Sequence, residues 1–454
     1  MDKGMRTWKI ACMIGSVTYL VITLFVSGHV QAQSKAPDVV RIKIGGLLTL
    51  SGPAVAWHGA GGKIQISYFK YLNTLGGIPY REPDGSKRRF VIEHKYEDCA
   101  YSPQKAVTTY GRLRDWKAHL IIVHGSSPAG STSTLAIRDK VPMLHVFSVH
   151  PSPMSYMDNI DKEYLMANAV SIVTLTHQNL MAYKKGVWEE KHRGHSGKAM
   201  KAAIIAFDNP SRRLYKKGVV KKLYAKSSID LVGVELVPMA STDVTVQLNR
   251  IFREGPHVLV MDHATPGVKV ILECAVRLGI RDKIGFISSY NLLRELLAIP
   301  ELFDGVYNPW ISSMYYTDDR SPEAGICAGR YLQDDPGYWE YRVDHAIQVQ
   351  HVLMVGIEAV KRCLEEYGYE GFSRSRLRNT MFNLTDVDTG LCLRFSIDPK
   401  FPITQPYSAL YRLDAKNKIY HQVGPIVAPG PSPFYPRWNP RENKEVMSNY
   451  YQWP

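Results

Sequence analysis

The feature that most constrains the fold is a repeated alternation of short apolar segments and helical patterns along most of the chain. In its first unit, residues 41–62, an apolar run breaks at Ser51-Gly52-Pro53 and passes through a glycine-rich turn into a helical pattern at 63–75. A strand that leads through a loop into a helix is the opening of an α/β domain. Ligands of open parallel sheets bind beyond the carboxyl ends of strands. This loop is therefore the first place to expect a ligand.

The same rhythm continues in two successive series, which predicts parallel sheets built from right-handed βαβ units. In the first series Asp84-Gly85 predicts a hairpin turn, and Ser102 with Pro103 predicts the start of a helix. The other predicted strands are 90–96, 120–123, 141–147, 202–206, 231–237, 257–261, 284–288, 391–396 and 409–413. Residues 164–176 have a less regular pattern. Residues 306–316 are aromatic and irregular, and residues 338–366 are predicted to form a long helix.

Length and composition indicate a large globular protein. A chain of 454 residues exceeds one ordinary domain, and 45% hydrophobic with 22% charged residues is typical of folded proteins. The net charge of +14 is spread over many segments. Because a nucleic-acid interface needs clustered charge, we expect no nucleic-acid partner.

The N-terminus has the pattern of a secretory signal peptide. Lys3, Arg6 and Lys9 precede an apolar run at 10–26, and small residues lead up to Ala32. This predicts cleavage after Ala32 and export of the mature chain; an uncleaved anchor is the alternative. Five cysteines remain, an odd number, so at least one thiol is free or pairs between chains. They are Cys99, Cys274, Cys327, Cys363 and Cys392. The proline-rich residues 425–454 predict an extended tail.

Several catalytic templates fail on inspection. Residues 125–129 miss the last glycine of a nucleophile elbow. Residues 59–63 lack the first glycine and the Ser or Thr of a phosphate-binding loop. Two histidine pairs, His145 with His150 and His192 with His195, lack the neighbouring carboxylates or cysteines of a metal site. No catalytic residue, metal or cofactor is predicted.

Polar residues follow three of the predicted strands: Ser126 and Ser127, the run 148–150, and Ser289 with Tyr290. Hydroxyls and free N–H groups at the start of a helix suit a carboxylate, although such serines can equally be helix caps without a ligand. Trp57, His58 and Tyr290 add aromatic rings in predicted loops, which is typical of a small-molecule pocket.

Three blocks in order resemble one family. They are Ile44-Gly45-Gly46-Leu47-Leu48-Thr49-Leu50-Ser51-Gly52-Pro53, Asn73-Thr74-Leu75-Gly76-Gly77-Ile78, and Tyr96-Glu97-Asp98-Cys99 with Pro103-Gln104-Lys105-Ala106. Over about residues 40–413 the chain resembles periplasmic solute-binding proteins of the branched-chain amino-acid (leucine-binding protein-like) ABC transporter family.

The resemblance implies a type I periplasmic-binding fold: α/β, with two doubly wound parallel-sheet lobes joined by a three-stranded hinge. Lobe 1 would be 37–168 with 315–392, and lobe 2 would be 169–314 with 393–424. Ser127 and the loop 148–150 would hold a ligand carboxylate, and Trp57 or His58 would cover the ligand. The full predicted ligand-binding set is Trp57, His58, Ser126, Ser127, Ser148, Val149, His150, Thr265 and Tyr290.

Two departures from the family pattern bear on the ligand. Amino-acid binders of the family have a glutamate near residue 286 for the ligand ammonium, where this chain has Ser289-Tyr290-Asn291. Burying an ammonium without a counter-charge is costly, so the sequence favours an aromatic acid, an amide or a similar solute over an ordinary α-amino acid. Ser126 also replaces the family cysteine that would pair with Cys99.

We therefore expect a periplasmic, monomeric, non-enzymatic receptor that delivers a small organic molecule to the permease subunits of an inner-membrane ABC importer. The alternatives are a ligand sensor that signals to a membrane partner and an exported enzyme.

Overall fold

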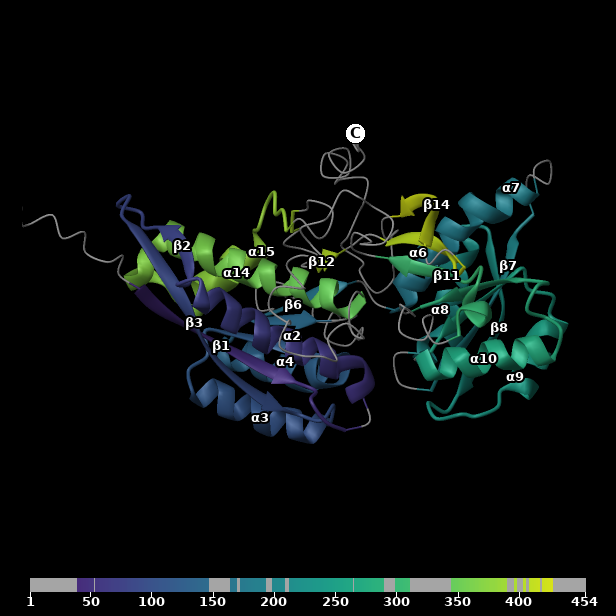
Figure 1. Ribbon diagram of the computed structural model, residues 1–454, viewed down its shortest axis with the longest axis horizontal. Coiled ribbons are helices and arrows are strands. Elements are labelled where there is room, and N and C mark those ends of the chain that lie inside the picture. Colours follow the sequence, from purple (N-terminus) through teal and green to yellow (C-terminus); the bar gives the residue numbers. More distant parts are fainter. Residues whose placement is uncertain are drawn as a thin grey trace, which may run out of the picture.

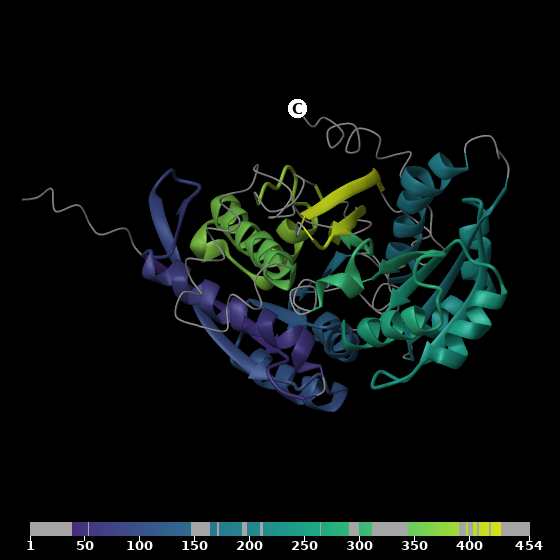
Figure 2. The same ribbon diagram turned by 45° about the vertical axis from the view of Figure 1, so that its right-hand side comes forward.

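The computed structural model describes residues 39–52, 54–146, 164–169, 172–192, 198–208, 212–263, 265–289, 299–310, 344–389, 396–397, 403–405, 408–416 and 419–427. These residues form two α/β lobes that lie side by side in both views (Figures 1 and 2). Each lobe is built around a seven-stranded, largely parallel sheet. The predicted α/β class with two doubly wound lobes is confirmed.

The sheet of the first lobe has the strand order β12-β6-β5-β4-β1-β3-β2, and only the β2–β3 pair is antiparallel. Its strands are β1 (Val39–Leu48), β2 (Ile78–Arg81), β3 (Lys87–Asp98), β4 (Leu120–His124), β5 (Met143–Val146), β6 (Leu165–Ala169) and β12 (Ile403–Gln405). The chain passes from β1 to β3 on one side and then to β4 on the other. The strand order therefore reverses between β1 and β4, which is where ligands of such sheets bind.

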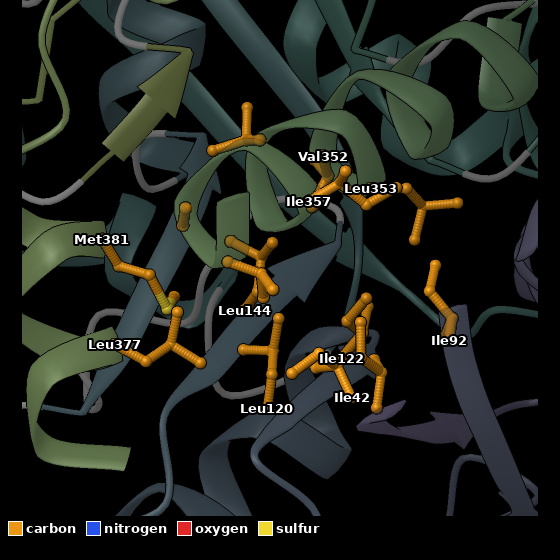
Figure 3. Packing of buried hydrophobic residues seen from close by; sticks show 14 of the residues in the cluster. Ile42, Ile92, Leu120, Ile122, Leu144, Val352, Leu353, Ile357, Leu377 and Met381 are labelled. Carbon is orange, nitrogen blue, oxygen red and sulfur yellow. The ribbon is translucent and has the colours of Figure 1, made fainter. Parts of the chain in front are cut away.

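Helices cover both faces of this sheet. One face packs against α2 (Val55–Thr74), α14 (Asp344–Gly371) and α15 (Arg374–Phe382); the other packs against α3 (Pro103–Asp115) and α4 (Ser126–Asp139). Figure 3 shows Ile42, Ile122 and Leu144 from three adjacent strands in the cluster with Leu353 of α14. Each such side chain, fully buried, contributes about 1.5–3 kcal/mol.

The second lobe has the order β14-β13-β11-β10-β9-β7-β8. Its strands are β7 (Met200–Phe207), β8 (Ile229–Val237), β9 (Val258–Asp262), β10 (Gly285–Ser288), β11 (Tyr307–Trp310), β13 (Ser408–Asp414) and β14 (Ile419–Val427). Its helices are α6 (Ile172–Tyr183), the π-helical turn Lys184–Trp188, α7 (Glu189–Lys191), the 3-10 turn Arg212–Lys216, α8 (Gly218–Ala225), α9 (Thr245–Arg253), α10 (Thr265–Arg277) and α12 (Pro300–Phe303). Here the strand order reverses between β7 and β9.

Three chain crossings connect described elements of the two lobes: β6 to α6, β11 to α14, and β12 to β13. β12 pairs with β6, so residues 403–405 extend the first sheet. In the described part of the chain, no helix has the length and apolar character needed to cross a membrane.

The glycine-rich stretch after β1 is helical, which corrects the predicted loop at 55–62. α2 begins at Val55 rather than at residue 63. A Cβ on Gly61 would lie 3.0 Å from Val349 and 3.1 Å from His124, and one on Gly62 would lie 2.6 Å from Leu50. These glycines therefore serve close packing of the helix, a tertiary cause that local sequence does not reveal.

Five strands were missed by the sequence reading, namely β2, β6, β11, β12 and β14. β6 lies in the segment predicted to be less regular, β11 in the segment predicted to be irregular, and β14 continues to Val427 beyond the predicted start of the tail. β11 and β13 join residues about a hundred positions apart, such as Tyr307 and Arg412. Short strands of this kind are specified by distant partners. The predicted strand 391–396 lies almost wholly outside the described residues, and so do residues 428–454 and 1–38.

Two local predictions are confirmed. The Ser102 hydroxyl accepts a hydrogen bond from the Lys105 N–H at 3.4 Å, and Pro103 is the first residue of α3. The Asp84-Gly85 turn joins β2 to β3 as a hairpin.

Candidate ligand-binding site

The carboxyl ends of β1 and β4 border the position where the first sheet reverses its order. Ser126 and Ser127 are half-buried and are the first two residues of α4, directly after β4. Gly125 precedes them with φ 95° and ψ 149°, a conformation essentially restricted to glycine. A Cβ at Gly125 would lie 2.4 Å from the Tyr101 ring. Gly125 thus lets an aromatic ring lie against the start of α4, where free N–H groups suit a polar oxygen.

The aromatic wall beside these serines is formed by His58 and Tyr101. Their rings stack with centroids 5.0 Å apart and planes 15° apart, and the Tyr101 hydroxyl lies 3.5 Å from that of Ser126. His58 is 7% exposed and lies in the first turns of α2, so the predicted exposed-loop position is wrong. Trp57 precedes it in α2, but its side chain lies outside the description. Tyr101 was not predicted.

Asp98 holds together the two loops that present this wall. Its carboxylate accepts hydrogen bonds from the Leu50 N–H at 2.9 Å, the Ala100 N–H at 2.9 Å and the Ser51 hydroxyl. Partial burial alone would raise the pKa of Asp98, but these hydrogen bonds hold it below its ordinary value. Ala100 and Tyr101 have φ values of 49° and 59°. A non-glycine residue in that region costs about 1–3 kcal/mol, which the Asp98 hydrogen bonds help to offset.

A buried polar network lies behind the loops. His124 Nε2 is 2.8 Å from Gln65 Oε1, and Gln65 Nε2 is 3.1 Å from His94 Nε2. Burial lowers the pKa of His124 and His145 to about 3 and that of His94 to about 4, so all three are neutral at pH 7. Among the described residues, no side chain forms a hydrogen bond with the fully buried His145, although the Gly125 backbone favours its protonated form. The described residues contain no cluster of His, Cys, Asp or Glu suited to a metal ion.

The second lobe places a buried ion pair at its own reversal position. Asp262 ends β9, and its two oxygens accept hydrogen bonds from Arg212 Nε and Nη2, both at 3.1 Å. The Tyr215 hydroxyl donates to the same carboxylate at 2.9 Å. The side chains of Arg212 and Asp262 are 4% and 0% exposed. The guanidinium also lies 4.5 Å from the centre of the Phe207 ring, at the end of β7.

This ion pair was not predicted, although the sequence carries a signal for it. Asp262 directly follows the apolar run 258–261 and is the last residue of β9. A carboxylate in that position needs a cationic or hydrogen-bonding partner.

The remaining predicted residues fall only partly within the described residues. Thr265 is the first residue of α10, after β9, with its side chain outside the description. Ser148, Val149, His150 and Tyr290 lie outside the described residues. Ser289 is 4% exposed, and its hydroxyl has no hydrogen-bond partner among the residues that the structure describes.

The described cysteines are buried free thiols: Cys99, Cys274 and Cys363. Cys99 Sγ lies 3.8 Å from the Thr49 hydroxyl beneath the first loop. Desolvation raises the pKa of the Cys99 thiol, so it is protonated at neutral pH. Cys327 and Cys392 lie outside the described residues.

Comparison with known proteins identifies the family of the chain. A search of the curated proteins finds no match. Among solved structures, a Thermus thermophilus branched-chain amino-acid ABC transporter protein with bound valine has a TM-score of 0.67 and 14% identity, covering 88% of this chain and 98% of its own. A fatty-acid ABC transporter substrate-binding protein from Thermomonospora curvata has a TM-score of 0.66 and 15% identity, covering 88% and 95%.

A third structure is an ABC transporter solute-binding protein from Rhodopseudomonas palustris in complex with 3,4-dihydroxybenzoic acid. Its TM-score is 0.63 and its identity 16%, covering 87% of this chain and 99% of its own. At these identities the structures establish a shared fold. The model of the periplasmic binding protein family, however, matches residues 41–418 and so includes strands of both sheets. By that match the chain belongs to the periplasmic binding protein family.

Proposed function

We propose that the protein is an extracytoplasmic solute receptor that hands a small organic ligand to an ABC importer. The observation that carries this proposal is the position of Ser126 and Ser127. They begin α4 at the reversal of the first sheet, beside the stacked rings of His58 and Tyr101. This arrangement offers hydrogen-bond donors for one end of a ligand and an aromatic wall for its body. Family membership makes an importer the expected destination.

The proposed ligand is an aromatic acid, an amide or a similar solute. The N-terminal end of α4 favours an anionic or strongly polar oxygen. The segment after β10 supplies Ser289, Tyr290 and Asn291 rather than a carboxylate, and the carboxylate of Asp262 is already paired with Arg212. An ammonium group would thus lack a partner in these segments. The solved neighbours whose names include valine, a fatty acid and dihydroxybenzoic acid indicate how widely ligands vary on this fold.

Closure of the two lobes would bury the ligand. We propose 37–168 with 315–392 and 169–314 with 393–424 as approximate lobe boundaries, with β12 as a local exception because it pairs with β6. Ser148, Val149, His150, Thr265, Tyr290 and Trp57 are proposed to complete the site. The protein is proposed to act as a monomer in the periplasm, with cleavage after Ala32, and without catalysis.

Mass spectrometry of the natively purified protein should identify a co-purified solute, and calorimetry should then measure its affinity beside leucine, 4-hydroxybenzoate and benzamide. Losing a hydrogen bond to a charged group costs about 1.5–3 kcal/mol. Ser127→Ala should therefore weaken binding about ten- to hundredfold at unchanged thermal stability. Ser131→Ala is the matched control, because that hydroxyl bonds within its own helix to the Pro128 carbonyl at 3.0 Å.

Tight binding of leucine without binding of aromatic acids or amides would contradict the proposed ligand class. The proposed receptor function would be contradicted if no solute co-purified or bound, or if the protein turned the solute over. Peptide sequencing of the mature N-terminus should begin at Gln33.

A further inference from the structure

Helix α8 of the second lobe presents a dense group of lysines to solvent. Its inner face is buried in the second-lobe core through Val220, Leu223 and Tyr224. On and beside its outer face lie five exposed lysines, which we call the lysine face: Lys216, Lys217, Lys221, Lys222 and Lys226. Residues 208–230 as a whole contain seven basic and only two acidic side chains.

The two acidic side chains of this segment are balanced by other basic residues. Arg213 donates two hydrogen bonds to Asp208, at 2.7 and 3.0 Å. These hydrogen bonds, with the charges of Arg213 and Lys216, hold the pKa of Asp208 below its ordinary value. Asp230 lies opposite Lys201 in the parallel register of β7 and β8. In the described part of the chain, no lysine of the lysine face forms an ion pair. Its positive charge is therefore largely uncompensated.

The lysines are also spaced so that they repel one another in the free protein. Lys217 and Lys221 are four residues apart, and so are Lys222 and Lys226. Residues at this spacing are neighbours on a helix surface, where like charges are unfavourable. An anionic surface bound to the lysine face would offset this repulsion.

The residue types indicate which kind of anionic partner fits. Arginine forms bidentate pairs with individual carboxylates, but Arg212 and Arg213 are already paired with aspartates. The aromatic rings of the segment, Tyr215 and Tyr224, are fully buried and cannot stack on nucleic-acid bases. The lysine ammonium groups that remain act as flexible point charges. They suit a surface of many equivalent phosphates better than a few oriented carboxylates.

The shape of the exposed helix supports the same partner. By helical spacing, Gly218 and Ala225 lie between Lys221 and Lys222 on the outward side, and a Cβ on Gly218 would meet no atom within 4 Å. Val219 borders this side and is 42% exposed. Small residues let the lysines approach a broad flat surface together. Lysines beside an exposed apolar residue on a helix are typical of segments that bind anionic lipid headgroups.

We propose that the lysine face of α8 docks the protein reversibly on the anionic phospholipid surface of a membrane. The ammonium groups would contact lipid phosphates, and Val219 would meet the headgroup region. α8 lies in the second lobe, whereas Ser126 and Ser127 lie in α4 of the first lobe (Figure 1). The inference therefore does not depend on the solute proposal. Docking would keep the protein at the membrane surface whether or not solute is bound.

The test measures co-sedimentation of the purified protein with vesicles. One set contains phosphatidylcholine alone, and the other adds about 30% phosphatidylglycerol, an anionic lipid. At about 0.15 M salt, where charges act over about 8 Å, the protein should bind the anionic vesicles and not the neutral ones. The double variant Lys221→Glu with Lys222→Glu should weaken this binding at least about twentyfold.

The matched control is Lys70→Glu with Lys105→Glu. These exposed lysines lie on α2 and α3 of the first lobe, and the control changes the net charge by the same amount. It should bind the anionic vesicles normally. Both double variants should keep the melting temperature of the parent, which shows that any loss of binding is not a loss of fold.

Four results would overturn the proposal. The first is no binding to anionic vesicles, and the second is equal weakening by the two double variants, which would assign binding to net charge. The third is equal binding to neutral vesicles, which would assign it to the apolar run at 10–26. The fourth is binding of a polyglutamate peptide without binding of vesicles, which would assign the lysine face to an acidic protein.

Discussion

The buried Arg212–Asp262 ion pair of the second lobe gives the sharpest test of how charge burial affects the stability of the fold. Arg212 and Arg213 are adjacent, and each makes two hydrogen bonds to an aspartate. The Arg212–Asp262 side chains are 4% and 0% exposed, whereas the Arg213–Asp208 side chains are 62% and 41% exposed. The two pairs differ mainly in their access to water.

Arg212→Met should strongly destabilise the second lobe. It removes the guanidinium and leaves the Asp262 carboxylate buried, with the Tyr215 hydroxyl still donating a hydrogen bond to it. Breaking a buried pair in this way costs about 3–5 kcal/mol. For a unit of 150–250 residues, each kcal/mol lowers the melting temperature by about 2–4 °C. The second-lobe transition should therefore fall by roughly 6–20 °C in scanning calorimetry at pH 7.

The control and the rescue separate charge burial from loss of packing. Arg213→Met should produce little or no change, because water screens an exposed pair. The double variant Arg212→Met with Asp262→Leu should recover at least half of the lost stability, because it removes the second charge. Equal destabilisation by Arg212→Met and Arg213→Met, or no recovery in the double variant, would refute the reasoning.

Two further perturbations test the first lobe. Gly125→Ala should lower the free energy of unfolding by about 1–3 kcal/mol or more, because its Cβ would meet the Tyr101 ring. Gly130→Ala, in the helix that follows, is the control: its Cβ would enter open space, so urea unfolding should show no change or a slight stabilisation. Folded-state pKa values near 3 mean that His124 and His145 each reduce stability by about 1.4 kcal/mol per pH unit as the pH falls below about 6.5. His145→Phe should therefore flatten the loss of stability between pH 6 and pH 4 without harm at pH 7. His124→Phe should already destabilise at pH 7, because it removes the partner of Gln65; equal behaviour of the two variants would contradict this.

Local signals predicted those parts of the fold whose cause lies within a few residues. The Ser102 cap with Pro103 and the Asp84-Gly85 hairpin appear as expected, because capping and turn geometry are short-range. The strands with continuous apolar runs also appear. The helical state of the glycine-rich stretch was missed, because glycine is a poor helix former unless a neighbouring element needs close approach. The close packing of Gly61 against Val349 and His124 and of Gly62 against Leu50 explains it.

The residues of the candidate site also fall into those that a local sequence pattern predicted and those that only the tertiary structure revealed. Ser126 and Ser127 were identified because polar residues follow an apolar strand, a pattern visible in one segment. Tyr101 was missed, because its place beside His58 depends on Asp98 joining two loops and on Gly125 leaving room.

By itself, the sequence determined the α/β class, the two lobes and the strand ends that carry polar residues, because periodicity and turn chemistry are local. Tertiary structure alone decided which of those ends meet: the stacked His58–Tyr101 pair and the Arg212–Asp262 pair. Each of these joins residues from separate elements. Their energies depend on burial and on non-local pairing, which no single segment encodes.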